Sequence, residues 1–201
     1  MHDVGIYENL ILGIHFLLLK KCKIFDEKTI VRCYTGRSMR IKVRKHERRG
    51  YQSIKMSNIL EKQFLKQRND FEKSCVERDK KYHFPQGVIF ETDIAYAKDK
   101  NKAHRLDRYR PKGKETQILP VIINVHGGGL LLGNKEFNKF FCALLSKKGF
   151  LVYSMEYRLI PDCTFFDQLR DIFLAMDFVK EHAAADGGDL SHVYLVGDLS
   201  L

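Results

Sequence analysis

A histidine followed by three glycines stands beyond the middle of the chain, at His126-Gly127-Gly128-Gly129. Successive glycines let the backbone approach a ligand closely and can point several N–H groups into one space. Such a cradle suits either a phosphate or the oxyanion that develops during acyl transfer. The sequence offers neither G-x-G-x-x-G nor a following Gly-Lys-Ser/Thr, which disfavours the phosphate. A tight strand-to-helix turn, the purely structural alternative, explains one glycine more easily than three.

A second candidate for chemistry lies where an apolar run breaks at Gly197-Asp198, within the stretch VYLVGDLSL of residues 193–201. A nucleophile elbow, G-x-S-x-G, needs small residues two before and two after its serine, because the turn is strained. Counting from Gly197 places Leu199 in the position of the serine and Leu201 in that of the exit glycine. Ser200 is therefore a candidate nucleophile in the wrong register, and we expect it to be a bystander.

The elements that would position these residues alternate along the chain. Continuous apolar runs predict buried strands, and helical spacing of apolar residues predicts helices between them. The strands are expected at 119–125, 150–157 and 193–196, and the helices at 137–148 and 165–185. This alternation with short loops predicts parallel crossovers in a layered α/β sheet. Both candidate segments follow such strands, and active groups are expected at the carboxyl ends of parallel strands.

Further elements are expected before the glycines. Apolar residues recur at helical spacing among charges over 57–81, which predicts one or two amphipathic helices with Ser57 or Asn58 as a cap. Pro85 and Gly87 then interrupt the pattern, and strands are predicted at 88–96 and 106–109.

The chain from about Gly87 to Asp198 resembles the α/β-hydrolases of the hormone-sensitive-lipase type, because several motifs of that family occur in it in the family's order. The segment 126–129 is similar to the oxyanion-hole motif of that family, and 157–162, YRLIPD, to its Y-R-L-A-P-E. Phe166 and Asp171 stand in a long helix as in the family, and the segment 188–191, GDLS, precedes the strand that leads to the elbow. The resemblance implies a truncated α/β-hydrolase fold: a mostly parallel sheet flanked by helices, behind an N-terminal helical, basic leader.

The resemblance also implies hydrolysis of a carboxylic ester through a serine acyl-enzyme. The N–H groups of Gly128 and Gly129 would stabilise the oxyanion, while His126 and Gly127 would shape the loop. A small-molecule ester is then the expected ligand, and no cofactor or metal is called for.

Two surroundings of this loop follow from the same resemblance. Arg158 and Asp162 would brace the turn after the second strand of the run, with a surface ion pair as the alternative. The helices before the first strand correspond to the segment that caps the substrate pocket. From that segment Phe64, Leu65 and Phe71 would line an acyl site, or else pack against the sheet.

The family's acid and base follow its serine in sequence, whereas all eight histidines here precede position 199. We therefore expect an esterase interrupted at the elbow by a frameshift, a premature stop or an incomplete gene, and inactive alone. Two alternatives stay open: a non-catalytic binding protein with a basic segment for anionic surfaces, and an enzyme completed by a separately encoded C-terminal fragment. Interruption would also leave 193–196 as an exposed apolar edge, which predicts poor solubility or dependence on a partner.

The charge divides the chain. Of its formal net charge of +10, all the excess lies in residues 1–85, with 20 Lys and Arg against 10 Asp and Glu; the remainder holds 15 of each. We divide the chain into a basic leader at 1–55 that need not belong to the working protein, cap-like helices at 56–86 and an incomplete hydrolase domain at 87–201. Residues 37–49 could contact an anionic surface weakly, but they lack the interleaved aromatics of a specific nucleic-acid site.

Localisation can be argued from two features. The apolar run 10–19 is too short to span a bilayer of about 30 Å as a helix. The five cysteines are odd in number, scattered and without a C-x-x-C pair, so neither a disulfide framework nor a zinc site is indicated. A reducing, cytoplasmic setting is expected.

Overall fold

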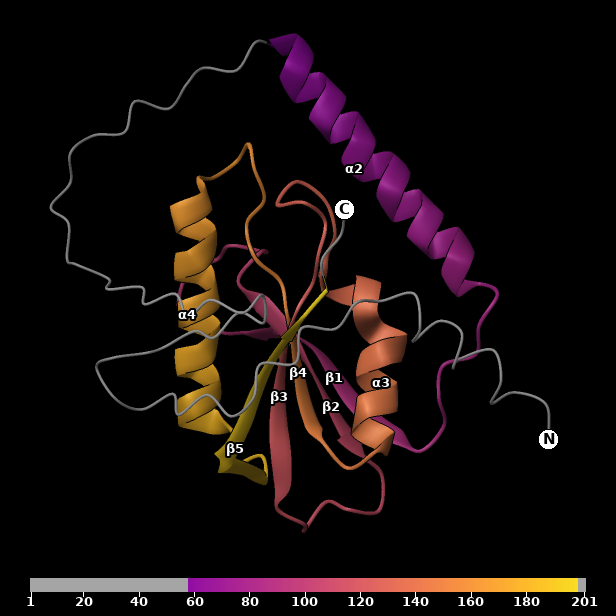
Figure 1. Ribbon diagram of the computed structural model, residues 1–201, viewed down its shortest axis with the longest axis vertical. Coiled ribbons are helices and arrows are strands. Elements are labelled where there is room, and N and C mark those ends of the chain that lie inside the picture. The colour runs from indigo at the N-terminus through magenta and orange to yellow at the C-terminus, as the bar shows by residue number, and fades with distance from the viewer. Residues whose placement is uncertain (1–57, 199–201) are drawn as a thin grey trace, which may run out of the picture.

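The computed structural model describes residues 58–198, and these form a five-stranded sheet with helices on both faces (Figure 1). The strands lie side by side in the order β1-β2-β4-β3-β5. Their bounds are β1 Val88–Ala95, β2 Arg105–Pro111, β3 Leu119–Val125, β4 Leu151–Met155 and β5 Gly188–Gly197. The helices are α2 Asn58–Asp79, α3 Lys139–Lys147 and α4 Phe165–His182, with a 3-10 turn η1 at Lys135–Asn138. The expected basic leader, including 10–19 and 37–49, and the elbow residues Leu199 and Ser200 lie outside the described residues.

The sheet is mixed. β4, β3 and β5 are parallel neighbours, joined by α3 and α4 as the alternation predicted. β2 is antiparallel to both β1 and β4. Four strands therefore run in one direction, and β2 runs in the other. The expectation of a mostly parallel sheet is correct for the directions of the strands. Of the four pairs of neighbouring strands, however, only two are parallel.

β5 differs most from its sequence prediction, because it starts at Gly188 rather than at Val193. Pro120 pairs with Asp189 and the next residue, Val121, pairs with Val193, so three residues bulge out between the two pairings. A Cβ on Gly188 would lie 2.7 Å from Val121 Cγ2, which explains why glycine opens the strand.

β5 pairs with β3 and has no second strand beside it among the described residues. The expectation of an exposed apolar edge is nevertheless wrong for its side chains. Val193 packs into the core on the α4 side and Val196 into the core on the α3 side, and both are buried. Tyr194 and Leu195 are half-buried. The edge is therefore one of backbone, because alternate side chains of the strand are covered on both faces.

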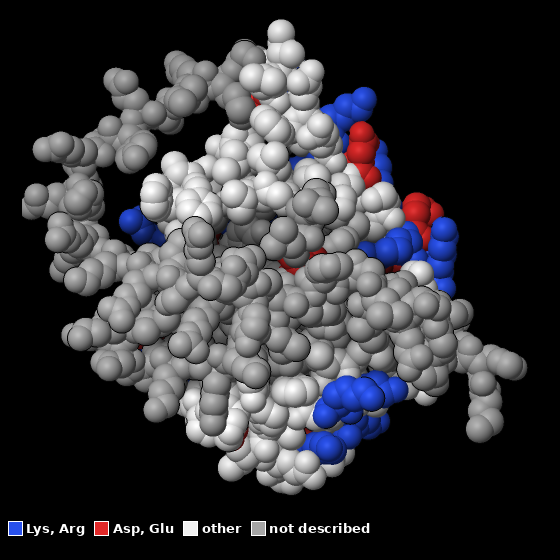
Figure 2. Space-filling view, viewed as in Figure 1, with Lys and Arg blue, Asp and Glu red and all other residues white. Residues whose placement is uncertain are grey.

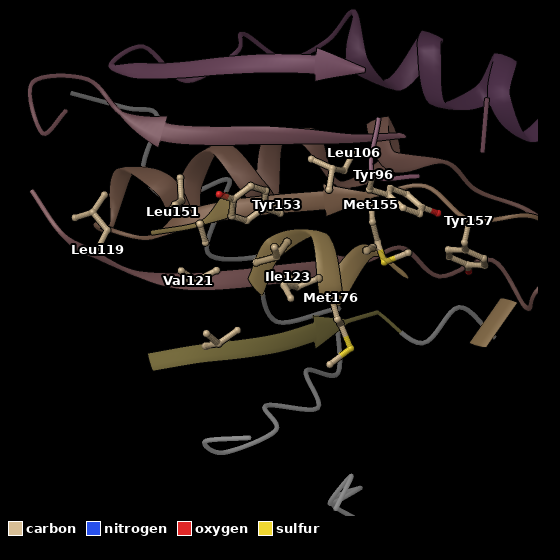
Figure 3. Close-up of a cluster of buried hydrophobic side chains, with 14 residues drawn as sticks. Tyr96, Leu106, Leu119, Val121, Ile123, Leu151, Tyr153, Met155, Tyr157 and Met176 are labelled. Atoms are coloured by element: carbon tan, nitrogen blue, oxygen red, sulfur yellow. The ribbon is translucent and has the colours of Figure 1, made fainter. Parts of the chain in front are cut away.

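Two cores hold the layers together. The larger one, drawn in Figure 3, packs α4 against the sheet through residues such as Ile123, Tyr153 and Met176. The smaller one packs α3 against the other face around Ile122 and Cys142. α4 begins at a capping box in which Thr164 and Asp167 satisfy each other's backbone N–H groups. β3 thus carries the glycine loop from the buried middle of the sheet, whereas β5 lies at its edge.

α2 is one continuous helix, and it runs diagonally beside the body, near the end where the parallel strands terminate (Figure 1). A half-buried stripe recurs on it at helical spacing, made of Phe64, Arg68, Phe71, Cys75 and Arg78. Apart from Asp79 at its end, the other residues of the helix from Ile59 on are exposed, and Lys, Arg, Asp and Glu mix along that edge in Figure 2. Among residues 58–198 no helix is both long and apolar enough to cross a membrane.

Candidate active site

The carboxyl ends of β3 and β5 bring the two candidate segments together. Val125 pairs with Gly197 at the last rung of the sheet, and each strand continues directly into its candidate segment. The Gly127 amide donates to Asp198 Oδ1 at 2.6 Å. Asn138 Nδ2 donates to the same oxygen at 3.0 Å. Asp198 thus fastens the start of the glycine loop to the end of β5.

His126 is buried, and both of its ring nitrogens face oxygen atoms. Nδ1 lies 2.8 Å from the Gly127 carbonyl, and Nε2 lies 2.9 Å from Glu156 Oε1. The ring stacks on Tyr157 with 4.3 Å between centroids. The Tyr157 hydroxyl in turn donates to the His126 carbonyl at 2.8 Å. This geometry is suited to holding the loop, since the imidazole is fully engaged there.

The glycine loop closes through its own backbone. The amides of Leu131 and Leu132 both donate to the Gly128 carbonyl, at 3.0 and 2.9 Å. At Gly128 φ is +133°, and a Cβ there would lie 1.9 Å from the Leu132 carbonyl oxygen. Gly133 has φ +94° and is just as constrained, because its Cβ would lie 2.4 Å from the Gly127 oxygen. The loop therefore needs Gly133 as well, which the sequence analysis did not single out.

Residues of α2, of α4 and of the loop that contains Ile160 hold the glycine loop at Leu130 and Leu131. Leu130 has φ +70°, an unfavourable value for a leucine. Its carbonyl accepts from the Ile160 amide at 3.0 Å and from Gln168 Nε2 of α4 at 2.9 Å. The neighbouring Leu131 carbonyl accepts from Arg68 Nε of α2 at 2.9 Å. The loop conformation is thus determined from outside as well as by its own turn.

Arg158 and Asp162 do not pair with each other. Arg158 forms a two-pronged pair with Asp171 of α4, Nε to Oδ2 at 2.9 Å and Nη2 to Oδ1 at 2.7 Å. Hydrogen bonding to Asp171 raises the pKa of the Arg158 guanidinium. Asp162 instead binds Arg68, at 2.7 Å. Both residues brace the loops around the site, but with partners that lie elsewhere in the sequence.

The predicted acyl-site residues of α2 separate onto two faces. Phe71 lies in the half-buried stripe with its ring 5.2 Å from that of Phe137, so it packs on η1. Phe64 belongs to the same stripe, whereas Leu65 lies beside the stripe and is exposed. Phe64 and Phe71 therefore face the body and Leu65 does not. A role for any of them in an acyl site stays a prediction.

Two carboxylates hold the site, and the sequence analysis singled out only Asp198 and missed Glu156. Glu156 directly follows β4 and joins His126 to the start of η1, where its Oε2 accepts from the Lys135 amide at 3.1 Å. Asp198 directly follows the last residue of β5. An acid placed immediately after a buried strand is the signal that could have identified Glu156 as well.

A buried ion pair lies behind η1. Lys135 Nζ is 2.9 Å from Asp107 Oδ1, and both side chains are almost fully buried. Burial by itself would lower the pKa of Lys135, but its bonds to Glu136 and Asp107 outweigh this and raise it. Burial raises the pKa of Asp107. Within 58–198 no group of three or more His, Cys, Asp or Glu side chains is arranged to hold a metal ion.

Several proteins that are similar to part of this chain are esterases. The BD-FAE family matches residues 106–200. Isoprenylcysteine alpha-carbonyl methylesterase ICME of Arabidopsis thaliana is 31% identical over 94 residues, which are 47% of this chain. Esterase B from Lactobacillus rhamnosis superposes with a TM-score of 0.62 and 30% identity over 70% of this chain. Part of the chain resembles the α/β-hydrolase esterases.

The match to these esterases is partial on both sides. It spans 22% of the length of the Arabidopsis methylesterase and 46% of the esterase B chain. A further crystal structure of esterase B, with a TM-score of 0.59 and 29% identity, is of a form with a tributyrin phosphonate, an analogue of an ester substrate. The esterase-like part of this chain contains the glycine loop, the loop of Arg158, and β5 with Asp198.

Proposed function

We propose that this chain supplies the oxyanion-binding side of a carboxylic-ester hydrolase that works through a serine acyl-enzyme. The observation that carries the proposal is the glycine loop, fixed at the end of β3 and bonded through Gly127 to Asp198, the residue that enters the elbow. In this proposal the amides of Gly128 and Gly129 donate to the oxyanion of the tetrahedral intermediate. The likeness to esterases over residues 106–200 supports the ester as the substrate class.

The braces around the loop support this role because oxyanion stabilisation depends on donors that are already in place. Removing one such donor costs about 10²–10³ in rate in enzymes of this kind. The start of the loop is held at His126, which contacts Glu156 and Tyr157. The Leu130 carbonyl is held by the Ile160 amide and by Gln168. None of these groups reacts; they support the peptide N–H groups that would donate to the oxyanion.

Turnover is a separate matter, because Leu199 occupies the position of the elbow serine. A leucine has no hydroxyl with which to attack a carbonyl, and Ser200 is one residue out of register. We propose that this chain binds the acyl part of an ester without forming an acyl-enzyme. Ligand binding and catalysis can then be tested independently.

The test of binding is an NMR titration of the isotope-labelled chain with butyrate, whose carboxylate imitates the oxyanion. We expect the largest amide shifts at Gly128 and Gly129, with millimolar affinity. Butyrate shifts elsewhere in the chain and none at these two glycines would contradict the proposal. Gly113→Ala is a matched control, because Gly113 also has positive φ and lies away from the loop; its butyrate affinity should equal that of the wild type.

The test of turnover is the release of p-nitrophenol from p-nitrophenyl butyrate. We expect no rate above the uncatalysed one for the wild-type chain. A rate that Ser200→Ala abolishes would show that Ser200 acts after all, and would overturn the proposal that the chain binds without reacting.

The leucine at position 199 also favours a second candidate, a non-catalytic binding protein that uses residues 37–49 on an anionic surface. That segment holds seven Lys and Arg and one Glu. Retention of the full chain on heparin should fall sharply when these seven residues are replaced by glutamine, if this candidate is right. Unchanged retention would contradict it.

A further inference from the structure

α2 is attached to the body at two places along its half-buried stripe. Near its C-terminal end, Arg78 Nη2 donates to the Phe137 carbonyl at 3.0 Å, and Asp79 pairs with Lys139 at 2.7 Å. Near its middle, Arg68 reaches across to the glycine loop. The first attachment involves only η1 and α3, whereas the second involves the proposed oxyanion site.

The guanidinium of Arg68 has three acceptors on two loops. Nε donates to the Leu131 carbonyl at 2.9 Å and Nη1 to Asp162 Oδ2 at 2.7 Å, while Nη2 donates to the Ile160 carbonyl. The Arg68 side chain is only 13% exposed, although Asp162 is 62% exposed. A planar fork that is buried against three acceptors has a fixed orientation.

Two peptide planes connect Arg68 to the Gly129 amide. The Leu131 carbonyl and the Leu132 N–H belong to one rigid peptide unit, so the bond from Arg68 fixes both groups. The Leu132 N–H donates to the Gly128 carbonyl at 2.9 Å. The Gly128 carbonyl and the Gly129 N–H form the next rigid unit. The direction of the Gly129 N–H is thus coupled to the guanidinium of Arg68.

We propose that Arg68 is a positioning residue that orients the Gly129 N–H for the oxyanion, so that the cradle depends on α2 being seated. The oxyanion role of the Gly129 N–H rests on the proposed function. The coupling between Arg68 and the Gly129 N–H does not, because it can be measured without any ester. It also gives α2 a task that its mostly exposed surface does not explain. If α2 lifts at Arg68, the Leu131–Leu132 peptide loses its outer bond and the turn onto Gly128 loosens.

The alternative is that Arg68 merely ties a helix to the body, and Arg78 provides the matched control. Both are arginines of the same stripe, and both donate to a backbone carbonyl of the body. Only Arg68 contacts the glycine loop. Loosening α2 through Arg78 should leave the Gly129 amide in place, whereas removing Arg68 should move it.

The experiment compares Arg68→Ala, Arg68→Lys and Arg78→Ala in the full isotope-labelled chain by NMR. For Arg68→Ala we expect a displaced Gly129 amide resonance and hydrogen exchange of the Leu132 amide faster by about tenfold or more. Arg68→Lys keeps one donor and should give a smaller change with the same sign. Arg78→Ala should leave both amides as in the wild type.

Two results would overturn the inference: unchanged Gly129 and Leu132 amides in Arg68→Ala while α2 exchanges faster, or equal changes in Arg78→Ala. If Arg68→Ala does not fold, Arg68→Lys against Arg78→Ala decides the question on the same two amides. A butyrate titration separates the two proposals. A wild type that does not bind butyrate refutes the oxyanion role, yet the response of Gly129 and Leu132 to Arg68 still tests the coupling.

Discussion

Asp198 accepts the Gly127 amide at 2.6 Å and so joins the ends of two neighbouring parallel strands, β3 and β5. The same oxygen accepts from Asn138 at the junction of η1 and α3. Three segments that are far apart in sequence therefore meet at one carboxylate oxygen. Since a hydrogen bond to a charged acceptor is stronger than one between neutral groups, this contact is a main determinant of where the glycine loop begins.

Asp198→Ala should lower the free energy of unfolding by about 2 kcal/mol, because it removes a charged acceptor from two donors. Urea unfolding followed by circular dichroism measures the loss, and the Gly127 amide resonance should move. Asp198→Asn keeps an oxygen at the same place and should lose less. An Asp198→Ala chain within about 0.5 kcal/mol of the wild type would show that the contact contributes little.

The glycine loop gives a second prediction, which concerns backbone geometry rather than charge. Gly128→Ala places a Cβ 1.9 Å from the Leu132 carbonyl oxygen at a φ of +133°, and should destabilise the fold by about 3 kcal/mol. Gly113→Ala also has positive φ but meets no atom within 4 Å, so it should lose only about 1 kcal/mol. Equal losses in urea unfolding would mean that the turn onto Gly128 can relax.

The parallel part of the fold could be predicted from sequence because each of its elements carries a local pattern. The apolar run of β3 and the helical spacing of α4 appear in the structure close to the predicted bounds. The first half of β5 could not be predicted, because Gly188-Asp189-Leu190-Ser191 has the composition of a turn. Its strand character comes from pairing with β3, which is a property of the sheet.

The candidate site divides in the same way. The glycine cradle could be predicted from the sequence because its backbone conformation requires glycine, and consecutive glycines are easily recognised in a sequence. The ion pairs could not be predicted, because the partners are far apart in sequence. Arg158 pairs with Asp171 thirteen positions away, and Asp162 pairs with Arg68 ninety-four positions away. Which acid faces which arginine depends on how α4 and α2 pack, and neither packing has a local signal.

The pair of Arg158 and Asp171 gives a third prediction. Arg158→Met removes the guanidinium from the fully buried carboxylate of Asp171, which keeps the backbone amide of residue 158 at 3.1 Å and His104 Nε2 at 3.0 Å. It should cost about 3 kcal/mol in urea unfolding. Arg170→Met is the matched control, because Arg170 is 74% exposed and its pair with Asp167 is long, at 3.6 Å. The free energy of unfolding should fall by less than about 1 kcal/mol in this variant. The double variant Arg158→Met with Asp171→Asn should recover part of the loss. No recovery would place the cost in packing rather than in the stranded charge.

The capping box of α4 gives a prediction about pH. Asp167 Oδ2 accepts from the Thr164 hydroxyl at 2.6 Å and from the Thr164 amide at 3.0 Å. The bond from the Thr164 hydroxyl, and then that from its amide, lower the pKa of Asp167 below its ordinary value. Because the folded-state pKa is lowered, the contribution of this carboxylate is complete above its ordinary pKa of about 3.9 and is lost as the pH falls through the folded-state pKa.

Asp167→Asn should therefore be less stable than the wild type at neutral pH, and the difference should shrink below about pH 4. Urea unfolding of both chains from about pH 7 down to about pH 3 measures this difference. Thr164→Ala serves as the control for the cap itself, with an expected loss of about 1 kcal/mol at neutral pH. A difference between wild type and Asp167→Asn that stays constant or grows at low pH would mean that ionised Asp167 does not stabilise the helix start.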